Sequence, residues 1–435
     1  MTEASSKRPK VGPREVLSPV ADLLKYFGPA LMVSIAYVDP GNFGTDLAAG
    51  TAFKYGLIWA VWLASATAML LQYLSGKLGI ATGKSLPEMV RVSLGRKSFR
   101  VAYWLGAEAA AASTDLAEYL GTVVALNLLF GIPLLYASIF GALDVILIMV
   151  MVTRNFRLIE QLFVLLTSVL VIGFLYQLTM VKPDLGQVAF HSLVPGQMGG
   201  GEVLLVVGII GATVMPHALF IHSWLAKNKM DITGAKIAEP KDRYDSSNAS
   251  DQVRERTRKA HLWETVLMLT IAGVVNVGIL LVAIPLSPEQ ASTIKGAMQG
   301  LSQIFGPLVG VVFVVTLLAS GLTASTLGTM AGQVIMEGLI GGHVNIWVRR
   351  IVTRFVNVFP TTIAILLGFD PLSLLVYSQV ILSLLIPLPM IPLVYYTSKR
   401  RVMGRFVNRR VTVALALVSV GLILVFNSYL IISHI

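Results

Sequence analysis

The sequence of 435 residues contains no cysteine. This absence excludes disulfide bonds and thiolate metal sites, and it leaves the redox compartment of the protein undetermined. Charged residues are also scarce, at 13% of the chain, whereas 55% of the residues are hydrophobic and the mean hydropathy is +0.75. Soluble domains carry about twice this share of charge. The composition therefore predicts a polytopic membrane protein.

The first 20 residues lack an apolar core and a cleavage-like site, so we expect a disordered cytoplasmic tail and no cleaved signal peptide. The net charge of +11 does not indicate nucleic-acid binding, because the basic residues fall in alternate connections between apolar runs. This is the positive-inside pattern. It places the N-terminus in the cytoplasm and, with an odd number of spans, the C-terminus outside.

Apolar runs of roughly 20 residues, the length that crosses a bilayer, predict eleven spans. Their expected positions are 22–49, 56–80, 99–129, 133–152, 157–180, 201–226, 260–286, 304–338, 347–367, 371–396 and 411–432. Spans 1–5 and 6–10 form two halves of five, and an odd number of spans per half implies inverted topology. We expect a tail over 1–20, a first repeat over 21–182, a second repeat over 200–398 with a cytoplasmic loop over 228–259, and a basic loop and eleventh span over 399–435.

In each half, a proline interrupts the first span. Asp39-Pro40-Gly41-Asn42 breaks span 1 and Met215-Pro216-His217 breaks span 6. At membrane depth such breaks free backbone carbonyls, which are tolerated only where they line a cavity or coordinate something. One site could thus gather a carboxylate (Asp39), an amide oxygen (Asn42), a thioether (Met215) and the carbonyls near Ala36 and Ala212.

Oxygen ligands suit Mg, Ca or Mn, and an added sulfur favours Mn, Fe, Co or Cd over Ca and Mg. The alternative is that Asp-Pro-Gly is only a turn and that the methionine only packs. The occurrence of both signatures in corresponding spans favours the metal site.

Span 3 carries three acidic residues, Glu108, Asp115 and Glu118. Their spacings of seven and three place them on one helical face. We call this set the acidic stripe. Carboxylates inside a membrane indicate a proton or ion route; a buried ion-pair network that joins helices is the alternative. Arg354 in span 9 is the expected partner, whereas Arg349 and Arg350 are expected to anchor at headgroups.

Four further polar residues lie at membrane depth. His217 follows the second break and can reach the site or pass a proton toward the acidic stripe. For His222, a relay and a packing role are both open. Asn276 is expected to form an interhelical hydrogen bond, and Asp144 has no functional interpretation.

The chain resembles the natural-resistance-associated macrophage protein (NRAMP) family of divalent metal transporters. The resemblance extends from about Phe27 to the last span. It rests on the two broken-span signatures and on Ser113-Thr114-Asp115-Leu116-Ala117-Glu118, Gly211-Ala212-Thr213-Val214 and Ser378-Gln379-Val380.

The resemblance implies an all-α membrane protein with a LeuT-like 5+5 inverted repeat plus an eleventh helix, and proton-coupled import of Mn²⁺ or Fe²⁺. It also implies a set of metal ligands: Asp39, Asn42 and Met215 by side chain, Ala36 and Ala212 by carbonyl, and Gln379 in an occluded state. Met215 indicates a transition metal, because relatives specialised for magnesium lack it. The proton route expected from the intramembrane polar residues uses Asp39, His217, His222, Arg354 and the acidic stripe (Glu108, Asp115, Glu118).

The expected partners are divalent transition metals, including Cd²⁺ and Co²⁺, together with protons and the lipid bilayer. No cofactor, nucleic acid or obligate protein partner is expected. A sodium-coupled organic solute transporter of the same fold and a passive metal channel remain alternatives; no catalytic constellation supports an enzyme. The compact loops indicate a bacterial inner membrane protein.

Overall fold

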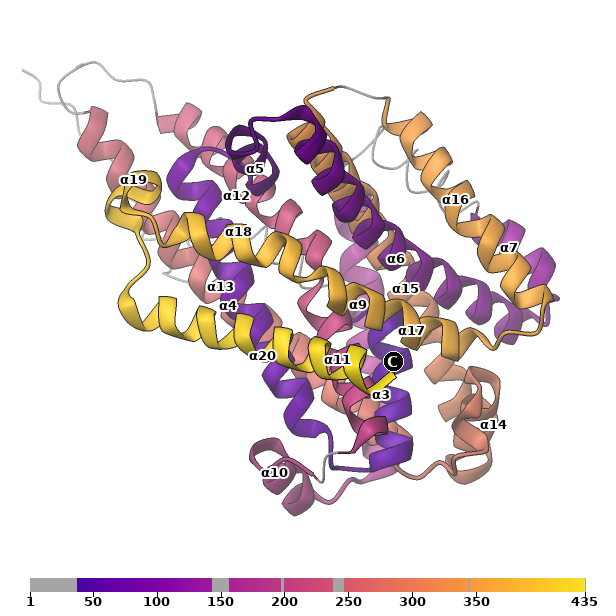
Figure 1. The fold of residues 1–435 in the computed structure, drawn as a ribbon. Coiled ribbons are helices and arrows are strands. Elements are labelled where there is room, and N and C mark those ends of the chain that lie inside the picture. Colours follow the sequence, from indigo (N-terminus) through magenta and orange to yellow (C-terminus); the bar gives the residue numbers. More distant parts are fainter. Residues whose placement is uncertain (1–36, 143–155, 197–198, 238–245, 343–344, 435) are drawn as a thin grey trace, which may run out of the picture.

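The computed structural model describes residues 37–142, 156–196, 199–237, 246–342 and 345–434. Within these ranges the regular elements are helices that pack into one bundle (Figure 1). Helices satisfy their own backbone groups, as hydrocarbon surroundings require. The first half contains α3 (Pro40–Phe53), α4 (Ile58–Thr82), α5 (Leu86–Ser93), α6 (Lys97–Phe130), α7 (Leu134–Ala142), α9 (Phe156–Val181) and α10 (Leu185–Leu193).

The rest of the described chain contains the helices that overlap the predicted spans 6 to 11. They are α11 (Gly200–Val214), α12 (Pro216–Ile237), α13 (Ser246–Ala283), α14 (Ile294–Phe305), α15 (Pro307–Ile340), α16 (Ile346–Leu366), α17 (Pro371–Leu385), α18 (Pro387–Thr397), α19 (Arg400–Met403) and α20 (Arg410–His434). Six of the described helical segments are long and apolar enough to cross a membrane, or seven if the bent pair α9–α10 counts as one. The prediction of a multi-pass membrane protein is therefore confirmed.

Several predictions fall outside the described residues. They concern the tail over 1–20, the carbonyl of Ala36, the carboxylate of Asp144, the side chain of Arg350, and parts of spans 1 and 4. The count of eleven spans consequently stays a prediction.

Two features differ from the expected spans. The segment 228–259 was expected to be a loop, but α12 continues to Ile237 and α13 already begins at Ser246. Hydropathy finds only the part of a helix that lies in lipid, and polar extensions such as Glu255–Arg258, an i,i+3 ion pair of 2.6 Å, escape it. Span 10 divides into α17 and α18 at Pro387, because proline removes a helix hydrogen bond.

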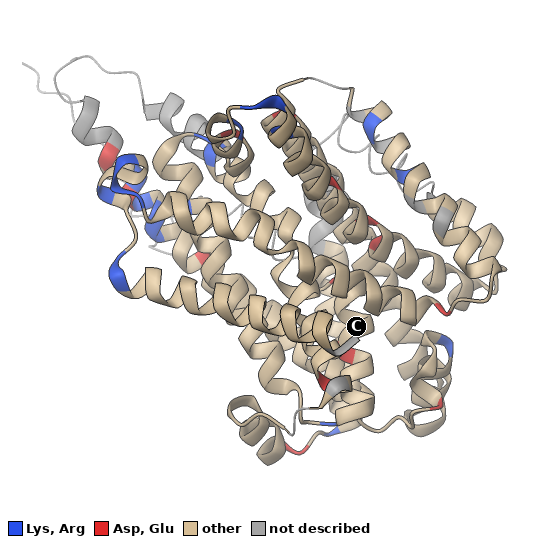
Figure 2. Ribbon diagram, viewed as in Figure 1, with Lys and Arg blue, Asp and Glu red and all other residues tan. Residues whose placement is uncertain are grey.

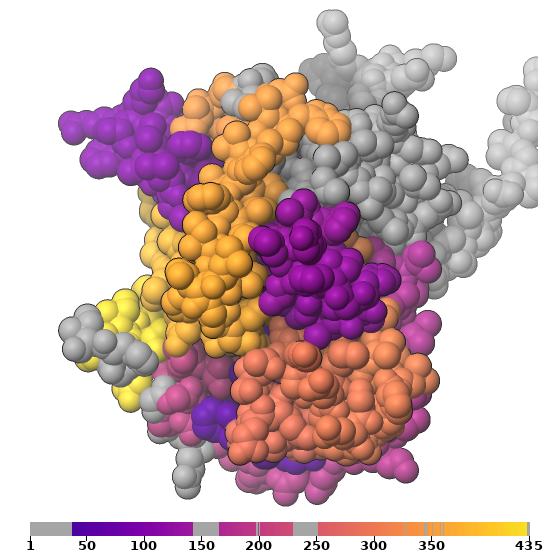
Figure 3. Space-filling model, turned by 90° about the vertical axis from the view of Figure 1, so that its right-hand side faces the viewer, coloured from indigo at the N-terminus to yellow at the C-terminus, as the bar shows by residue number. Residues whose placement is uncertain are grey.

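The short helix α3 lies in the middle of the bundle, where it packs against α13, α11, α17 and α6. Close approach depends on its glycines: a Cβ on Gly50 would lie 2.1 Å from the carbonyl oxygen of Leu280 in α13. The outer helices instead expose large apolar side chains, as lipid-facing surfaces do. One of them is α16, which lies on the face shown in Figure 3 and whose Phe355 and Phe359 are 70% and 69% exposed.

Candidate functional site

The first helix break lies at the N-terminus of α3. Asp39 is the N-cap residue, with Pro40 at the first helical position. Its Oδ1 accepts hydrogen bonds from the backbone N–H and from Nδ2 of Asn42, both at 2.8 Å. Its Oδ2 has no hydrogen-bond partner among the described residues. Because both side chains are fully buried, one carboxylate oxygen is held in place while the other remains available to a cation.

The second break lies between α11 and α12. Met215 caps α11 with φ 47° and ψ 92°, a left-handed conformation that costs a non-glycine residue about 1 kcal/mol or more. Pro216 has no N–H, so the carbonyl of Ala212, four residues earlier, loses its helical donor. The thioether of Met215 is 1% exposed. The break therefore presents a carbonyl oxygen and a sulfur inside the bundle.

A side-chain hydrogen bond joins the two breaks. The hydroxyl of Thr213 in α11 donates to Oδ1 of Asn42 in α3 at 3.1 Å. The carbonyl of Tyr37, just before the first break, accepts from Asn42 Nδ2 at 2.9 Å and from Asn276 Nδ2 in α13 at 3.2 Å. The hydrogen bond expected of Asn276 is thus present, but it runs to the chain just before α3 and not to another helix. The two interrupted helices meet in one buried place.

Gln379 of α17 lies next to the two helix breaks. A Cβ on Gly41 would sit 2.4 Å from the Gln379 side-chain amide, and one on Gly211 would sit 1.8 Å from its backbone oxygen. Glycines in both interrupted helices therefore let α17 approach them directly. The side chain is fully buried and donates to Ser378 Oγ at 2.9 Å.

The possible donors at the two breaks and on Gln379 are mixed: one carboxylate, two amide oxygens, a carbonyl and a thioether. The part of the chain that the structure describes contains no group of three His, Cys, Asp or Glu placed to hold a metal. A site built on Asp39 and Met215 therefore has one charged ligand, and its sulfur gives it a preference for a transition metal over Ca²⁺ or Mg²⁺.

The three carboxylates of α6 all face α15 and α16. Glu108 Oε2 lies 2.7 Å from Arg349 Nη2, and Asp115 Oδ1 lies 3.6 Å from Arg354 Nη1. The partner predicted for the acidic stripe, Arg354, is therefore found on Asp115. A Cβ on Gly328 of α15 would lie 2.8 Å from Glu118 Oε2. The side chains on this face match both an ion-pair network and a proton route.

The headgroup role expected of Arg349 is wrong. Its side chain turns inward and is 8% exposed. Gly332 of α15 makes room for it, since a Cβ there would lie 2.0 Å from the guanidinium. Position near a helix end does not show which way a long side chain points, and the sequence carries no signal for this pair other than the small residue in α15.

The two histidines of α12 contact different helices. His217 Nδ1 lies 3.0 Å from the hydroxyl of Thr114 in α6, next to Asp115 of the acidic stripe. His222 Nδ1 lies 2.7 Å from Oε1 of Gln72 in α4. Both imidazoles are 1% exposed. His217 thus lies between the second break and the acidic stripe, whereas His222 faces away from that helix toward α4.

Sequence reasoning missed Asp46. This residue of α3 is fully buried, and neither carboxylate oxygen has a hydrogen-bond partner within the described ranges. It follows Asn42 by four positions, which places both on one side of the helix. The available signal was a second carboxylate, after Asp39, in a half-helix with no other charged residue.

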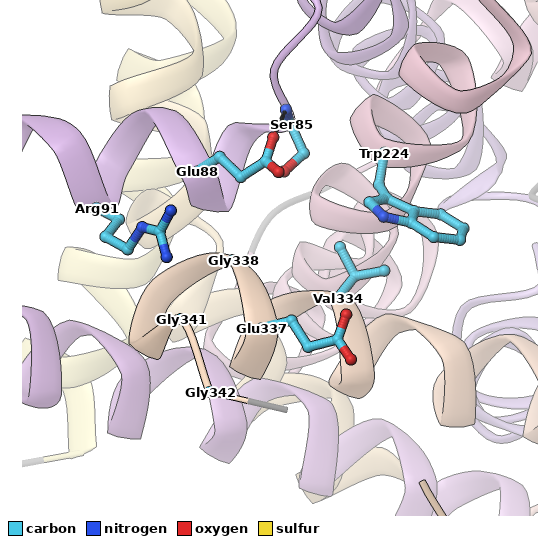
Figure 4. Close-up of a pocket in the computed structure, with 9 residues that line it drawn as sticks. All are labelled: Ser85, Glu88, Arg91, Trp224, Val334, Glu337, Gly338, Gly341 and Gly342. Atoms are coloured by element: carbon cyan, nitrogen blue, oxygen red, sulfur yellow. Dashed lines mark hydrogen bonds between the residues drawn. The ribbon is translucent and has the colours of Figure 1, made fainter. Parts of the chain in front are cut away.

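A separate cavity of about 210 Å³ opens where α5, α12 and α15 meet. Figure 4 shows Glu88 and Arg91 reaching toward it from α5, Glu337 from α15 and the indole of Trp224 from α12. No predicted ligand lines this cavity, so it is not the predicted metal site.

Comparisons with known proteins agree with this arrangement. Residues 30–433 match the model of a family described as natural resistance-associated macrophage protein-like. A "Divalent metal cation transporter MntH" of Deinococcus radiodurans is 37% identical over 429 residues, which cover 97% of this chain and 92% of that protein. A protein of the same name from Bacillus subtilis is 37% identical over 414 residues, covering 94% and 92%.

Solved structures share the fold. A crystal structure of a manganese transporter of Eremococcus coleocola has a TM-score of 0.82 and 31% identity, covering 95% of this chain and 87% of that one. A nucleobase-cation-symport-1 family transporter has a TM-score of 0.60 at 16% identity, covering 93% and 90%, and shows the fold alone. The predicted class, an all-α membrane protein with a LeuT-like fold, is confirmed.

Proposed function

The chain belongs to the natural resistance-associated macrophage protein-like (NRAMP) family, and from this premise we propose that it is a proton-coupled secondary transporter that imports divalent transition metal ions by alternating access. Members of the family are metal transporters and not enzymes, and the metal ion is their substrate. The proposed ions are Mn²⁺ and Fe²⁺, with Cd²⁺ and Co²⁺ as further substrates.

One observation carries the proposal: the Thr213–Asn42 hydrogen bond joins two helix breaks that each present metal donors. Asp39 supplies the charged ligand through Oδ2, and Asn42 supplies its amide oxygen once Thr213 releases it. Met215 supplies sulfur. The carbonyls of Ala36 and Ala212 complete the set, and Gln379 joins it when the site closes.

The membrane voltage drives this import. A divalent ion that moves inward across about 100 mV gains about 4.6 kcal/mol, and a co-transported proton adds about 2.3 kcal/mol. A metal that has shed its water pays a desolvation cost, which the single carboxylate and the oxygen donors offset. Rocking of one group of helices against the other then opens the site to the cytoplasm.

The acidic stripe and its arginines supply the proposed proton route. Asp39 takes up a proton when no metal is bound, and His217, which contacts Thr114 of α6, passes it on to Asp115 of the acidic stripe. Each carboxylate of the stripe that is paired with arginine can accept a proton only by weakening its ion pair. Glu118, Glu108 and Arg354 continue this route, with His222 on a second branch.

The charge distribution supports the proposed orientation. In Figure 2 the Lys and Arg residues gather at the end of the bundle that carries α5 and α19, with few at the opposite end near α10. Basic connections stay in the cytoplasm. We place the N-terminus there and the C-terminus outside, in the inner membrane of a bacterial cell.

The test of substrate class is metal uptake into proteoliposomes by Met215→Leu, which keeps volume but removes the sulfur. The matched control is Met390→Leu, another fully buried methionine, in α18. Under the proposal Met215→Leu loses Mn²⁺ and Cd²⁺ uptake, and Ca²⁺ and Mg²⁺ begin to compete, whereas Met390→Leu behaves as the natural protein. Unchanged selectivity in Met215→Leu would exclude the sulfur from the site.

Proton coupling is tested separately. In vesicles held at a fixed voltage, an inward proton gradient should raise Mn²⁺ uptake, and Mn²⁺ should drive proton entry. Uptake that is independent of the proton gradient and does not saturate with Mn²⁺ would instead identify a passive channel.

A further inference from the structure

A second set of buried polar side chains leaves the first break on the side of α4 and α13. The hydroxyl of Tyr37, beside the break, accepts a hydrogen bond of 2.6 Å from Nε2 of Gln72 in α4. Oε1 of Gln72 then lies 2.7 Å from Nδ1 of His222 in α12. All three side chains are at most 1% exposed. This path is separate from the acidic stripe of α6.

His261 of α13 continues the path. Its ring packs edge-to-face on that of His222, with centroids 4.9 Å apart and planes at 88°. It also stacks on Tyr73 of α4 at 5.9 Å and 18°. Gly76 of α4 makes the space, since a Cβ there would lie 2.2 Å from Nε2 of His261. Two buried imidazoles, from different helices, are thereby held against each other.

The amide of Gln72 decides which nitrogen of His222 is basic. Because Nε2 of Gln72 donates to Tyr37, the atom that faces His222 is the acceptor Oε1. Nδ1 of His222 therefore carries a hydrogen, which leaves Nε2 as the nitrogen that takes up a proton. The amide of Gln72 orients His222 and does not itself carry a proton, so the proton reaches Nε2 from water and charges the ring that packs on His261.

Beyond His261 the polar path reaches a more exposed region. The hydroxyl of Tyr73 accepts a hydrogen bond of 2.7 Å from Arg258 Nη1, and Arg258 pairs with Glu255 at 2.6 Å. The side chains of Arg258 and Glu255 are 22% and 35% exposed. The path thus runs from the buried break to the end of α13 that the proposed orientation places in the cytoplasm.

We propose that His222 and His261 share one proton and together form an exit branch for the transported proton. The inference rests on the proposed function. In the step, the N–H bond at Nε2 of protonated His222 breaks and one forms at a ring nitrogen of neutral His261, which leaves His222 neutral. The edge-to-face contact is not itself a hydrogen bond, so a ring rotation or one bridging water completes the transfer.

The surrounding charges limit this pair to a single proton. α4 brings Lys77 and the phenol of Tyr73 to this region, and α13 brings Arg258. These cations oppose a second proton on the pair, as does the first imidazolium. Two carboxylates favour the first proton on the pair. They are Glu264, which is buried three residues beyond His261 in α13, and Glu255. The titratable group that α12 brings to His261 is His222.

The test uses His261→Phe, which keeps the ring and its packing, and His261→Gln, which keeps polarity but does not titrate. In proteoliposomes, both variants should keep voltage-driven Mn²⁺ uptake near the natural level while Mn²⁺-driven proton entry falls about twofold or more, because the acidic stripe remains as the other route. Gly76→Ala should reproduce the loss by displacing His261. Gly278→Ala, also in the membrane, should not, because its Cβ would meet Leu178 at 3.4 Å, an ordinary contact. A normal ratio of protons to Mn²⁺ in both His261 variants, or an equal loss of both fluxes, overturns the inference.

A second readout does not depend on transport. Imidazole nitrogen signals of the purified protein, assigned with His222→Gln and His261→Gln, should show His222 and His261 titrating as one coupled pair. Removal of His261 should turn the titration of His222 into a single uncoupled step. If the titration of His222 is unchanged when His261 is removed, the two histidines share no proton. Failure of the proposed function would appear elsewhere, as absent Mn²⁺ uptake in the natural protein.

Discussion

The hydroxyl of Thr213 donates a hydrogen bond of 3.1 Å to the amide oxygen of Asn42, and this bond connects the two interrupted helices. The same oxygen is a proposed metal ligand. Metal and hydroxyl therefore compete for one acceptor. Under the proposed function, Thr213 holds the amide in place without metal and releases it when metal binds.

Thr213→Val removes the donor and keeps the shape of the side chain. We expect Mn²⁺ to bind about fivefold more tightly, because a buried hydrogen bond worth about 1 kcal/mol no longer competes. Isothermal titration of the purified protein measures this, with Thr213→Ser as the control that retains the hydroxyl. Weaker binding in Thr213→Val would mean that the hydroxyl itself supports the metal.

Gly41→Ala tests the role of Gln379. The new Cβ would sit 2.4 Å from the side-chain amide of Gln379 and push it away from the first break. If Gln379 joins the site only on closure, Mn²⁺ uptake should slow about tenfold, within the 1–3 kcal/mol range of overpacking, while Mn²⁺ affinity changes little.

The control for Gly41→Ala is Gly201→Ala, whose Cβ would meet Phe53 at an ordinary 3.7 Å. The double variant Gly41→Ala with Gln379→Ala should slow Mn²⁺ uptake no more than either change alone, because both changes remove the same contribution of the Gln379 side chain. If the two losses of Mn²⁺ uptake added up, Gly41 and Gln379 would act independently, which would contradict the prediction.

Gly332→Ala tests the ion pair of the acidic stripe. Its Cβ would lie 2.0 Å from the guanidinium of Arg349 and force that group off Glu108. We expect the free energy of unfolding to drop by about 2 kcal/mol, less than for a fully buried pair because Glu108 keeps some exposure. Thermal unfolding in detergent measures the loss. Gly421→Ala, with open space around it, should be neutral or stabilising, and equal behaviour of the two variants would contradict the prediction.

Glu88 predicts a pH dependence outside the membrane. Burial raises the pKa of this α5 carboxyl, but hydrogen bonds from Lys227 and the Ser85 backbone outweigh it and hold the pKa below the usual 4.5. A lowered pKa contributes stability that is complete above the unfolded value and disappears as the pH falls through the folded value.

Glu88→Gln should therefore lower the melting temperature at about neutral pH, and the difference from the natural protein should close at about pH 3. Melting curves across this range test it. A difference that stays constant with pH would show that Glu88 acts by packing alone.

The positions of the two breaks could be predicted from the sequence because proline lacks an N–H wherever it stands. The common face of Glu108, Asp115 and Glu118 followed from helical periodicity for the same local reason. The extra length of α12 and α13 could not be predicted, since hydropathy detects only the lipid-embedded part of a helix.

Contacts between helices could not be predicted from the sequence. The inward turn of Arg349, the Thr213–Asn42 bond and the packing of His261 on His222 depend on how each helix is rotated against its neighbours. That rotation is set by many side chains packing at once and by glycines such as Gly76 and Gly332 that admit a partner. The amino-acid sequence alone determined the membrane class, the interrupted spans and their donor atoms, because these follow from local covalent structure. Only the tertiary structure decided which donors meet and which charges pair, because those contacts join residues that are distant along the chain.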